Sequence, residues 1–146
     1  MARQGGFTLL EMIVVLSIMG LLMAIAAPSF SGFARRMDLR HSVTLLETDL
    51  KAARSHAMTT TTGAGVLFDL QRRQVRGVEG PAQTLPRGMA LTVQTARSQV
   101  AGAHAGAVWF YPDGSSTGGR VTVADGRQRY WIDIDWITGR VTTSAR

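Results

Sequence analysis

The stretch "GGFTLLEMIVVLSIMGLLMAIAAPSF", Gly5–Phe30, decides how the rest of this 146-residue chain is interpreted. From Phe7 to Ala34 it contains one ionisable side chain, Glu11, and residues 12–27 contain none. A helix of about 20 apolar residues crosses a hydrocarbon core about 30 Å thick, so this length predicts a membrane span. A carboxylate in such a span is costly, which makes Glu11 a candidate functional residue.

A cleaved secretory signal is the alternative interpretation of this stretch, because Arg3 provides a short basic segment in front of it. Two features favour a retained membrane helix. Glu11 interrupts the apolar run near its start, and Pro28 followed by an arginine pair replaces a small-residue cleavage site. Basic residues flank both ends of the span, so their distribution leaves its orientation open.

A helical pattern continues beyond the apolar stretch. A helix over residues 7–58 would be roughly 78 Å long, with Pro28 and Gly32 as its expected kink points. Glu47 and Lys51 are spaced to pair along it, and Thr59–Thr62 followed by Gly63 predict its end. Apolar residues recur at steps of four and three, which places them in one stripe: Leu39, Val43, Leu46, Leu50, Ala53 and Ala57.

After Gly63 the apolar period changes to two, which predicts strands at 65–70, 74–78, 89–95 and 107–111. Residues 96–106 show no period and are expected to form a loop. Residues 120–136 predict a hairpin with a two-residue turn at Asp125-Gly126. One face of its second strand should present Tyr130, Ile132, Ile134 and Trp136. The helical stripe is the available cover for this sheet, so the predicted fold is α+β, a long N-terminal helix packed on a mainly antiparallel β-sheet.

Composition restricts the chemistry of the chain. The absence of cysteine excludes disulfides and thiolate metal sites. The formal charge is +6, and fifteen of the sixteen basic residues are arginine, without any block of five like charges. An ordinary solvated surface is the favoured interpretation, with attraction to nucleic acid or anionic lipid as a minor hypothesis.

Two motifs resemble ligand sites, one for phosphate and one for a cation, but each is better explained without a ligand. The segment "DGSSTGG" has neither the Gly-Lys-Ser/Thr of a phosphate-binding loop nor a following helix, so a turn between strands is favoured. Asp133 and Asp135 share one predicted strand face. Solvated carboxylates are favoured there over a shared cation.

No catalytic or metal-binding grouping is evident. His41, His56 and His104 are far apart in the sequence, and Ser115 and Ser116 lack the surroundings of a nucleophile. The sequence therefore predicts no enzyme, no metal and no cofactor.

Trp131 is predicted to face away from Ile132 and Ile134. It either covers a loop or provides an exposed anchor for another subunit, and both alternatives stay open.

The start "GGFTLLE" resembles the class III signal of type IV pilin-like proteins: a short basic leader ending in Gly6, an aromatic first mature residue, Phe7, and a glutamate at Glu11. The distal segments "FYPDGSSTGGRV" and "YWIDIDWITGRV" resemble the GspH/FimT family of minor pilins and pseudopilins. "DLKAARSHAM" is similar to the end of that family's long helix, and "LPRGMALTVQTARS" to its middle strands. The resemblance covers nearly the whole chain and is strongest to the H-type minor pseudopilins of type II secretion.

The resemblance implies how the chain is processed and where it resides. A prepilin peptidase would remove the leader, residues 1–6, on the cytoplasmic side and methylate the new amine of Phe7. Residues 7–34 would form the membrane and filament-core half of the helix, and residues 35–62 its amphipathic half. Residues 63–146 would form a β-rich region in the periplasm. Loss of Arg3 leaves fifteen basic and ten acidic residues, a formal charge of +5.

The resemblance also implies partners. Glu11 would meet the N-terminal amine of a neighbouring subunit, the alternative being a hydrated carboxylate at headgroup level. The expected function is a structural subunit at or near the tip of the secretion pseudopilus, needed for export of folded exoproteins. Its expected partners are the prepilin peptidase, other minor pseudopilins, the major pseudopilin, the inner membrane before assembly and secreted exoproteins.

The alternative is a FimT/FimU-like minor type IV pilin that primes pili or captures DNA. The arginines considered for nucleic-acid contact are Arg127, Arg129, Arg140 and Arg146.

Overall fold

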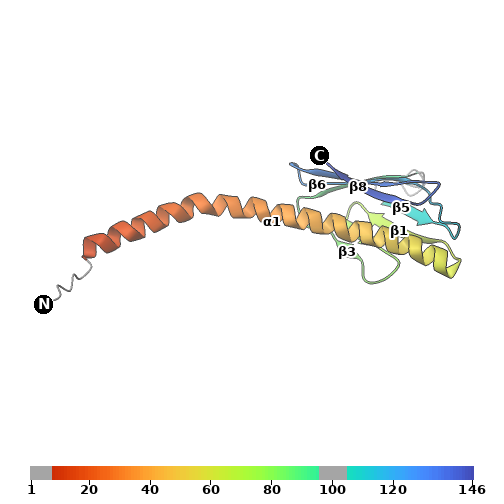
Figure 1. The fold of residues 1–146 in the computed structure, drawn as a ribbon, viewed down its shortest axis with the longest axis horizontal. Coiled ribbons are helices and arrows are strands. Elements are labelled where there is room, and N and C mark those ends of the chain that lie inside the picture. Colours follow the sequence, from red (N-terminus) through yellow and green to blue (C-terminus); the bar gives the residue numbers. More distant parts are fainter. Residues whose placement is uncertain (1–7, 96–104) are drawn as a thin grey trace. The chain divides into compact units, whose positions relative to one another are not determined.

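The fold is that of a computed structural model of the 146-residue chain. It describes residues 8–95 and 105–146, without the side chains of residues 25–34. The chain divides into two compact units, Met1–Met37 and Asp38–Arg146. The first contains the start of helix α1, and the second contains the rest of α1 and the strands (Figure 1).

Helix α1, Leu9–Thr60, matches the predicted bounds closely. Thr8 caps its start: the hydroxyl accepts the backbone N–H of Glu11 at 3.2 Å and satisfies one of the free donors of the first turn. The helix is assigned without a break at Pro28 and Gly32, so the kink expected there stays a prediction. Among the residues described, no helix meets the length and hydropathy required of a membrane span.

The end of α1 at Thr60 lies within the predicted range, residues 59–62. Thr61 has a positive φ of 54°, so it provides the left-handed residue that directly follows the helix. Threonine hydroxyls support this conformation locally: Thr60 donates to the carbonyl of His56 at 2.7 Å, and Thr61 donates to the carbonyl of Thr60 at 2.7 Å. Side-chain bonds to the backbone compete with further helical bonds and favour termination.

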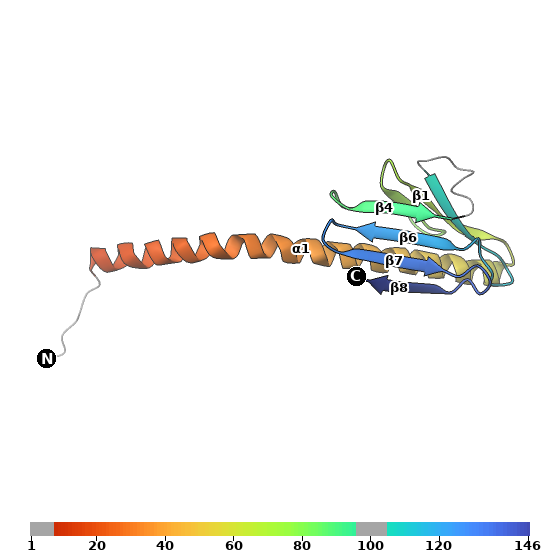
Figure 2. The same cartoon turned by 90° about the horizontal axis from the view of Figure 1, so that it is seen from above.

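The strands of the second unit form two antiparallel sheets of four strands each, in the orders β3-β2-β1-β5 and β4-β6-β7-β8. Figure 2 shows the strands of the second sheet side by side over α1. The antiparallel pairing is as predicted, but the strands divide between two sheets, whereas a single sheet was expected. The strand bounds are β1 Ala64–Asp69, β2 Gln74–Arg76, β3 Gln83–Thr84, β4 Ala90–Gln94, β5 Ala105–Phe110, β6 Gly119–Ala124, β7 Arg129–Ile134 and β8 Val141–Ala145.

Two strands, β3 and β8, were not predicted, and β5 begins at Ala105, inside the segment expected to be a loop. Residues 96–104 of that segment lie outside the described residues. The sequence of β8, "VTTSA", does not alternate apolar and polar residues, so periodicity gives no signal for it. It is a strand because it pairs with β7, from Ile134↔Val141 to Tyr130↔Ala145.

The hairpin between β6 and β7 also corrects the prediction. Ala124 pairs with Arg129, so four residues connect the strands and the expected two-residue turn is wrong. The carboxylate of Asp125 accepts the N–H groups of Arg127 at 3.0 Å and Gln128 at 2.8 Å. This Asx turn lengthens the connection, and only Gly126 of the expected turn pair has a positive φ, 85°.

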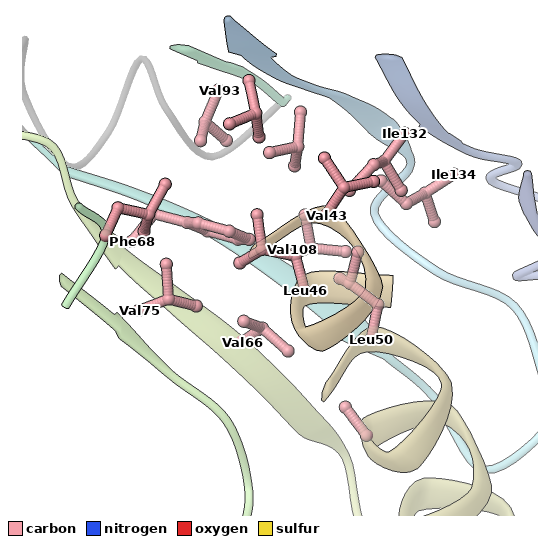
Figure 3. Close-up of a cluster of buried hydrophobic side chains, with 14 of the residues drawn as sticks. Val43, Leu46, Leu50, Val66, Phe68, Val75, Val93, Val108, Ile132 and Ile134 are labelled. Atoms are coloured by element: carbon pink, nitrogen blue, oxygen red, sulfur yellow. The ribbon is translucent and has the colours of Figure 1, made fainter. Parts of the chain in front are cut away.

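The core of the second unit lies between the two sheets and one face of α1. The predicted stripe is confirmed, because Leu39, Leu50, Ala53 and Ala57 are fully buried and Val43 and Leu46 almost so. Figure 3 shows Leu46 and Leu50 lying between Val66 and Val108 of the first sheet and Ile132 and Ile134 of the second. One helical stripe therefore covers the inner faces of both sheets.

Candidate functional site

The N-terminal site is described in part. Gly6 and Phe7 lie outside the described residues, so leader cleavage and methylation there stay predictions. Glu11 lies exposed in the first turn of α1. With Thr8 it has the Thr-x-x-Glu spacing of a capping box, whose hydroxyl-to-backbone half is formed. The carboxylate thus belongs to the first turn of α1, at the positive end of the helix dipole, where a negative charge is favoured.

Apolar side chains surround the helix in the first unit. Leu9 is 81% exposed and Met23 is 76% exposed. A helix that is apolar on all sides requires apolar surroundings, either lipid or other helices. The exposed large apolar side chains here are Leu9, Leu10, Met12, Ile13, Val14, Val15, Leu16, Ile18, Met19, Leu21, Leu22 and Met23.

In the second unit, the loop from Tyr111 to Gly118 and the turn from Asp135 to Gly139 are joined by hydrogen bonds. The hydroxyl of buried Ser116 donates to the carbonyl of Asp135 at 2.9 Å and accepts the N–H of Gly118 at 3.0 Å. The N–H of Ser116 donates to the carbonyl of Trp136 at 2.9 Å. The "DGSSTGG" segment is therefore a turn between β5 and β6, as predicted.

Carboxylates use the donors of these two turns. Asp113 accepts the N–H of Ser115 at 2.9 Å and its hydroxyl at 2.6 Å. Asp135 accepts the N–H of Thr138 at 2.7 Å and that of Ile137 at 3.1 Å. The pKa of Asp113 is below its ordinary value, chiefly because of the bond from the Ser115 hydroxyl. The pKa of Asp135 is also lowered, chiefly by the bond from the N–H of Thr138. Donors engaged in this way do not form a phosphate cradle.

Asp133 and Asp135 do not form a joint cation site. Asp133 lies on β7 and binds Arg120 of β6 through bonds of 2.5 and 3.2 Å, which raises the pKa of Arg120. Asp135 lies beyond the end of β7 and holds the following turn. Each carboxylate has its own partner. Among the residues that the structure describes, no group of three or more His, Cys, Asp or Glu side chains forms a possible metal site.

Three of the four arginines considered for nucleic-acid contact lie together. Arg127, Arg129 and Arg146 line a hollow of about 230 Å³ with Trp131, which we call the arginine hollow. The N–H of Arg146 donates to the carbonyl of Arg129 at 3.0 Å, and the reverse bond is 3.3 Å, so the C-terminus pairs with the start of β7. Arg140 lies elsewhere, at the other end of β8.

The tryptophans separate as well. Trp131 is half-buried and lines the arginine hollow. It is therefore neither the fully exposed side chain nor the fully covered one that the two alternatives predicted. Trp136 was expected on the buried face of a strand and is 67% exposed, because β7 ends at Ile134 and Trp136 belongs to the turn. The neighbouring Ile137 is 60% exposed. Trp136 and Ile137 therefore form an exposed apolar pair in the turn after β7.

A groove of about 550 Å³ lies between α1 and the start of β8. We call it the α1–β8 groove. Arg54 crosses it, and its Nε donates to the carbonyl of Thr138 at 3.2 Å. Further along, Glu47 binds Lys51 at 2.6 Å, as predicted, and accepts the hydroxyl of Thr143 at 3.0 Å. The lining residues are Lys51, Arg54, Ser55, Met58, Thr59, Thr138, Gly139, Arg140 and Val141.

This groove was not predicted. Lys51, Ser55 and Met58 lie off the buried stripe, which indicates an exposed face of α1 but no more. The opposite wall depends on β8, which gave no periodic signal. Gly139 makes the close approach possible, because a Cβ there would overlap the carbonyl oxygen of Gly114 and lie 3.0 Å from Nε of Arg54.

A long N-terminal helix whose second half is packed under antiparallel sheets is the arrangement of pilin-like proteins. Residues 1–27 match the prokaryotic N-terminal methylation motif, and residues 42–139, more than half of the chain, match the family described as Type II transport protein GspH. The chain belongs to this GspH family.

One relative and two solved structures define the nearer similarities. The chain is 32% identical over 136 residues, 93% of its length and 80% of the relative's, to type II secretion system protein H of Xanthomonas campestris pv. campestris. The minor pseudopilin EpsH of Vibrio cholerae has a similar fold, with a TM-score of 0.59 and 13% identity over 74% of this chain and 97% of that one. The type IV minor pilin FimU of Pseudomonas aeruginosa follows, with a TM-score of 0.52 and 16% identity over 77% of this chain and 92% of that one.

Proposed function

We propose that this chain is a minor pseudopilin of a type II secretion system. In this role it is a structural subunit at or near the pseudopilus tip, needed for export of folded exoproteins from the periplasm across the outer membrane. The observation that carries the proposal is the 32% identity to a type II secretion system protein H over 93% of the chain. The family is structural, and we propose no enzymatic activity and no cofactor for this member.

In this proposal the chain resides in the inner membrane before it is assembled into the pseudopilus. Residues 7–34 form its single membrane span, with the leader in the cytoplasm and the region from residue 63 onward in the periplasm. The methylation motif over residues 1–27 supports cleavage between Gly6 and Phe7 by a prepilin peptidase, followed by methylation of Phe7. The apolar surface from Leu9 to Met23 supports a segment that moves from lipid into a filament core.

In the filament, Glu11 is the proposed assembly residue. Its carboxylate would pair with the Phe7 amine of a neighbouring subunit, because a charge in apolar surroundings is stable only with a partner. The proposed neighbours are other minor pseudopilins and the major pseudopilin, with exoproteins as further partners.

A gene deletion in the source bacterium tests the secretion role. Exoproteins should then accumulate in the periplasm, and the wild-type gene should restore their export while surface pili stay normal throughout. The variant Gly6→Leu, which should retain its leader, should fail to restore export, and mass spectrometry of its N-terminus would verify the loss of cleavage. Normal export together with loss of pili would contradict the proposal.

The arginine hollow favours a second candidate function, a minor type IV pilin that primes pili or captures DNA. Arg127, Arg129 and Arg146 beside Trp131 combine cations for phosphates with an aromatic ring for bases. Neighbouring genes discriminate between the two functions, since secretion ATPase and pseudopilin genes support the first and pilus genes the second.

Binding of single-stranded DNA by the purified mature chain in detergent tests this second function directly. The expected result under it is a retardation that falls steeply with salt and is lost in Arg129→Gln. Arg140→Gln, outside the hollow, is the matched control and should bind DNA nearly as wild type does.

A further inference from the structure

Strand β8 forms an open edge of the second sheet. It is the last strand in the order β4-β6-β7-β8, and Figure 2 shows it at the outer side of the sheet, next to the label of the C-terminus. Thr142 to Ala145 are exposed. Natural sheets protect their edges with charges, prolines or bulges, and the five residues of β8, "VTTSA", include neither a charge nor a proline. This edge is therefore available for pairing.

The register shows which backbone groups are available. Asp135 donates to the carbonyl of Arg140 at 3.0 Å, and Arg129 and Arg146 exchange two bonds. The even-numbered residues of this segment thus face β7. In an antiparallel ladder, alternate residues direct their N–H and C=O groups to the other side. Val141, Thr143 and Ala145 consequently present theirs outward from the sheet.

The α1–β8 groove meets this edge at Val141 and supplies charge. Lys51 is paired with Glu47. Arg54 uses its Nε for the Thr138 carbonyl, which leaves the two terminal nitrogens of its guanidinium for an anion. Arg140 lies near Asp135, whose carboxylate is engaged by the turn. Among the residues described, neither Arg54 nor Arg140 forms an ion pair within 4.0 Å. The groove thus offers two arginines beside an unpaired strand edge.

We propose that the β8 edge and the α1–β8 groove together bind an extended acidic segment of another protein by strand addition. The segment forms a fifth strand of the second sheet through the outward groups of Val141, Thr143 and Ala145. Its alternate side chains on the helix side are carboxylates that meet Arg54 and Arg140. Backbone pairing supplies the affinity, and the charges select the sequence. The surface is independent of whether the chain serves secretion or pili.

Charge argues for a different protein as the occupant. A second copy would bring its own β8, which is flanked by Arg140 and Arg146, and the chain as a whole has a formal charge of +6. Like charges opposed across a strand pair are destabilising. An acidic segment has the complementary charge at both ends of the edge.

The test uses the mature full-length chain in detergent micelles and a blocked peptide of about six residues, a common strand length, in which glutamate alternates with threonine. Fluorescence anisotropy of the labelled peptide measures affinity, and hydrogen exchange measures protection of the amides of Val141, Thr143 and Ala145. We expect binding that weakens with salt and protects these three amides. Replacing each glutamate of the peptide by lysine should abolish binding.

Two variants of Thr143 distinguish backbone pairing at the β8 edge from the effect of losing the side-chain hydroxyl. Thr143→Pro removes an outward N–H but none of the bonds to β7, since proline is tolerated on edge strands where the N–H faces solvent. It should weaken binding by about tenfold or more, equivalent to about 1.4 kcal/mol. Thr143→Val keeps the N–H and loses only the hydroxyl bond to Glu47, so it should bind within about twofold of wild type. If Thr143→Pro fails to fold by circular dichroism, Ala145→Pro is used in its place.

The charge arm uses Arg54→Gln combined with Arg140→Gln, which should reduce affinity by about tenfold and remove most of the salt dependence. The proposal is overturned if the acidic peptide does not bind at millimolar concentration, or if the proline variant binds it unchanged. It is also overturned if the lysine peptide binds equally, or if the same amides become protected by self-association or by anionic phosphatidylglycerol vesicles without peptide.

Discussion

The carboxylate of Asp49 on α1 lies directly against the backbone of Gly77, where a Cβ would come within 3.2 Å of both Cγ and Oδ1 of Asp49. The other oxygen, Oδ2, is inaccessible and has no hydrogen-bond partner among the residues described. Burial raises the pKa of Asp49 above its ordinary value of 3.8. The close fit to Gly77 thus leaves one buried oxygen of the carboxylate without a hydrogen bond to offset its loss of hydration.

Asp49→Asn should stabilise the fold at neutral pH. Because the folded-state pKa of Asp49 is raised, the folded chain binds the proton more tightly than the unfolded chain. The favourable contribution of Asp49 is therefore complete below its ordinary pKa of 3.8 and is lost as pH rises through the raised folded-state pKa. The asparagine variant should gain about 1 kcal/mol at pH 7 and lose that part of the pH dependence. Unfolding by urea between pH 4 and 7 measures both.

Asp38→Asn is the matched control for this prediction. Asp38 is exposed on the same helix, so its replacement should leave the free energy of unfolding nearly unchanged at every pH. An Asp49→Asn variant with wild-type stability and pH dependence would show that the buried oxygen is solvated in solution.

Gly139→Ala should destabilise the turn that forms one wall of the α1–β8 groove. Its φ is 59°, and a Cβ would overlap the carbonyl of Gly114 and press on Arg54. Gly126→Ala is the control, since Gly126 also has a positive φ, 85°, but nothing lies within 4 Å of its Cβ position. The control should lose about 1 kcal/mol from backbone strain alone.

Overlap should cost Gly139→Ala a further 1–3 kcal/mol or so. Thermal unfolding followed by circular dichroism compares the two variants. Equal losses would mean that the turn moves aside freely and that the groove is not rigid.

Ser116→Ala should destabilise the chain by about 1–3 kcal/mol, because it leaves the N–H of Gly118 without its acceptor. The bond from Ser116 to the carbonyl of Asp135 is lost as well, so the two turns keep the backbone bond from Ser116 to Trp136 but lose the side-chain bond that supports it. Ser115→Ala is the control at the adjacent position, where the hydroxyl binds only the exposed Asp113. Urea unfolding should rank Ser115→Ala well above Ser116→Ala in stability, and the reverse order would contradict the described bonds.

Glu11 should be tested with two substitutions that separate its possible roles. Glu11→Ala removes both the charge and the capping side chain, whereas Glu11→Gln removes only the charge, since glutamine also serves at this position of a capping box. If Glu11 pairs with a neighbouring amine, both variants should be cleaved at Gly6 normally and fail to assemble. Immunoblots of processing and of sheared filaments provide the two readouts. Assembly of the glutamine variant would assign Glu11 to the helix and refute the pairing.

Local pattern accounts for the parts of the fold that were predicted. The stripe from Leu39 to Ala57 follows the period of a single helix, so it was identified completely. The division of the strands between two sheets depends on pairings such as Ala64↔Phe110, which join residues far apart and leave no periodic trace. Strand β8 is missing from the prediction for the same reason, and the α1–β8 groove with it. Trp136 was misplaced because alternation was continued two residues past the end of β7.

The same limit applies to the arginines. Residues Arg127 and Arg129 are close in sequence, and only the pairing of Arg146 with Arg129 brings the third arginine to them. Arg140 instead lines the α1–β8 groove, as does Arg54 of the helix. The two are far apart in the sequence, so their shared groove could not be predicted from it.

The shared stripe of α1 has a consequence for the order in which the chain folds. During synthesis, Leu46 and Leu50 leave the ribosome well before Ile132 and Ile134, the residues of the second sheet that pack against them. The stripe stays partly uncovered until the second sheet has been synthesised. A nascent chain of this kind is vulnerable to aggregation during that interval, so the speed of translation should influence its yield.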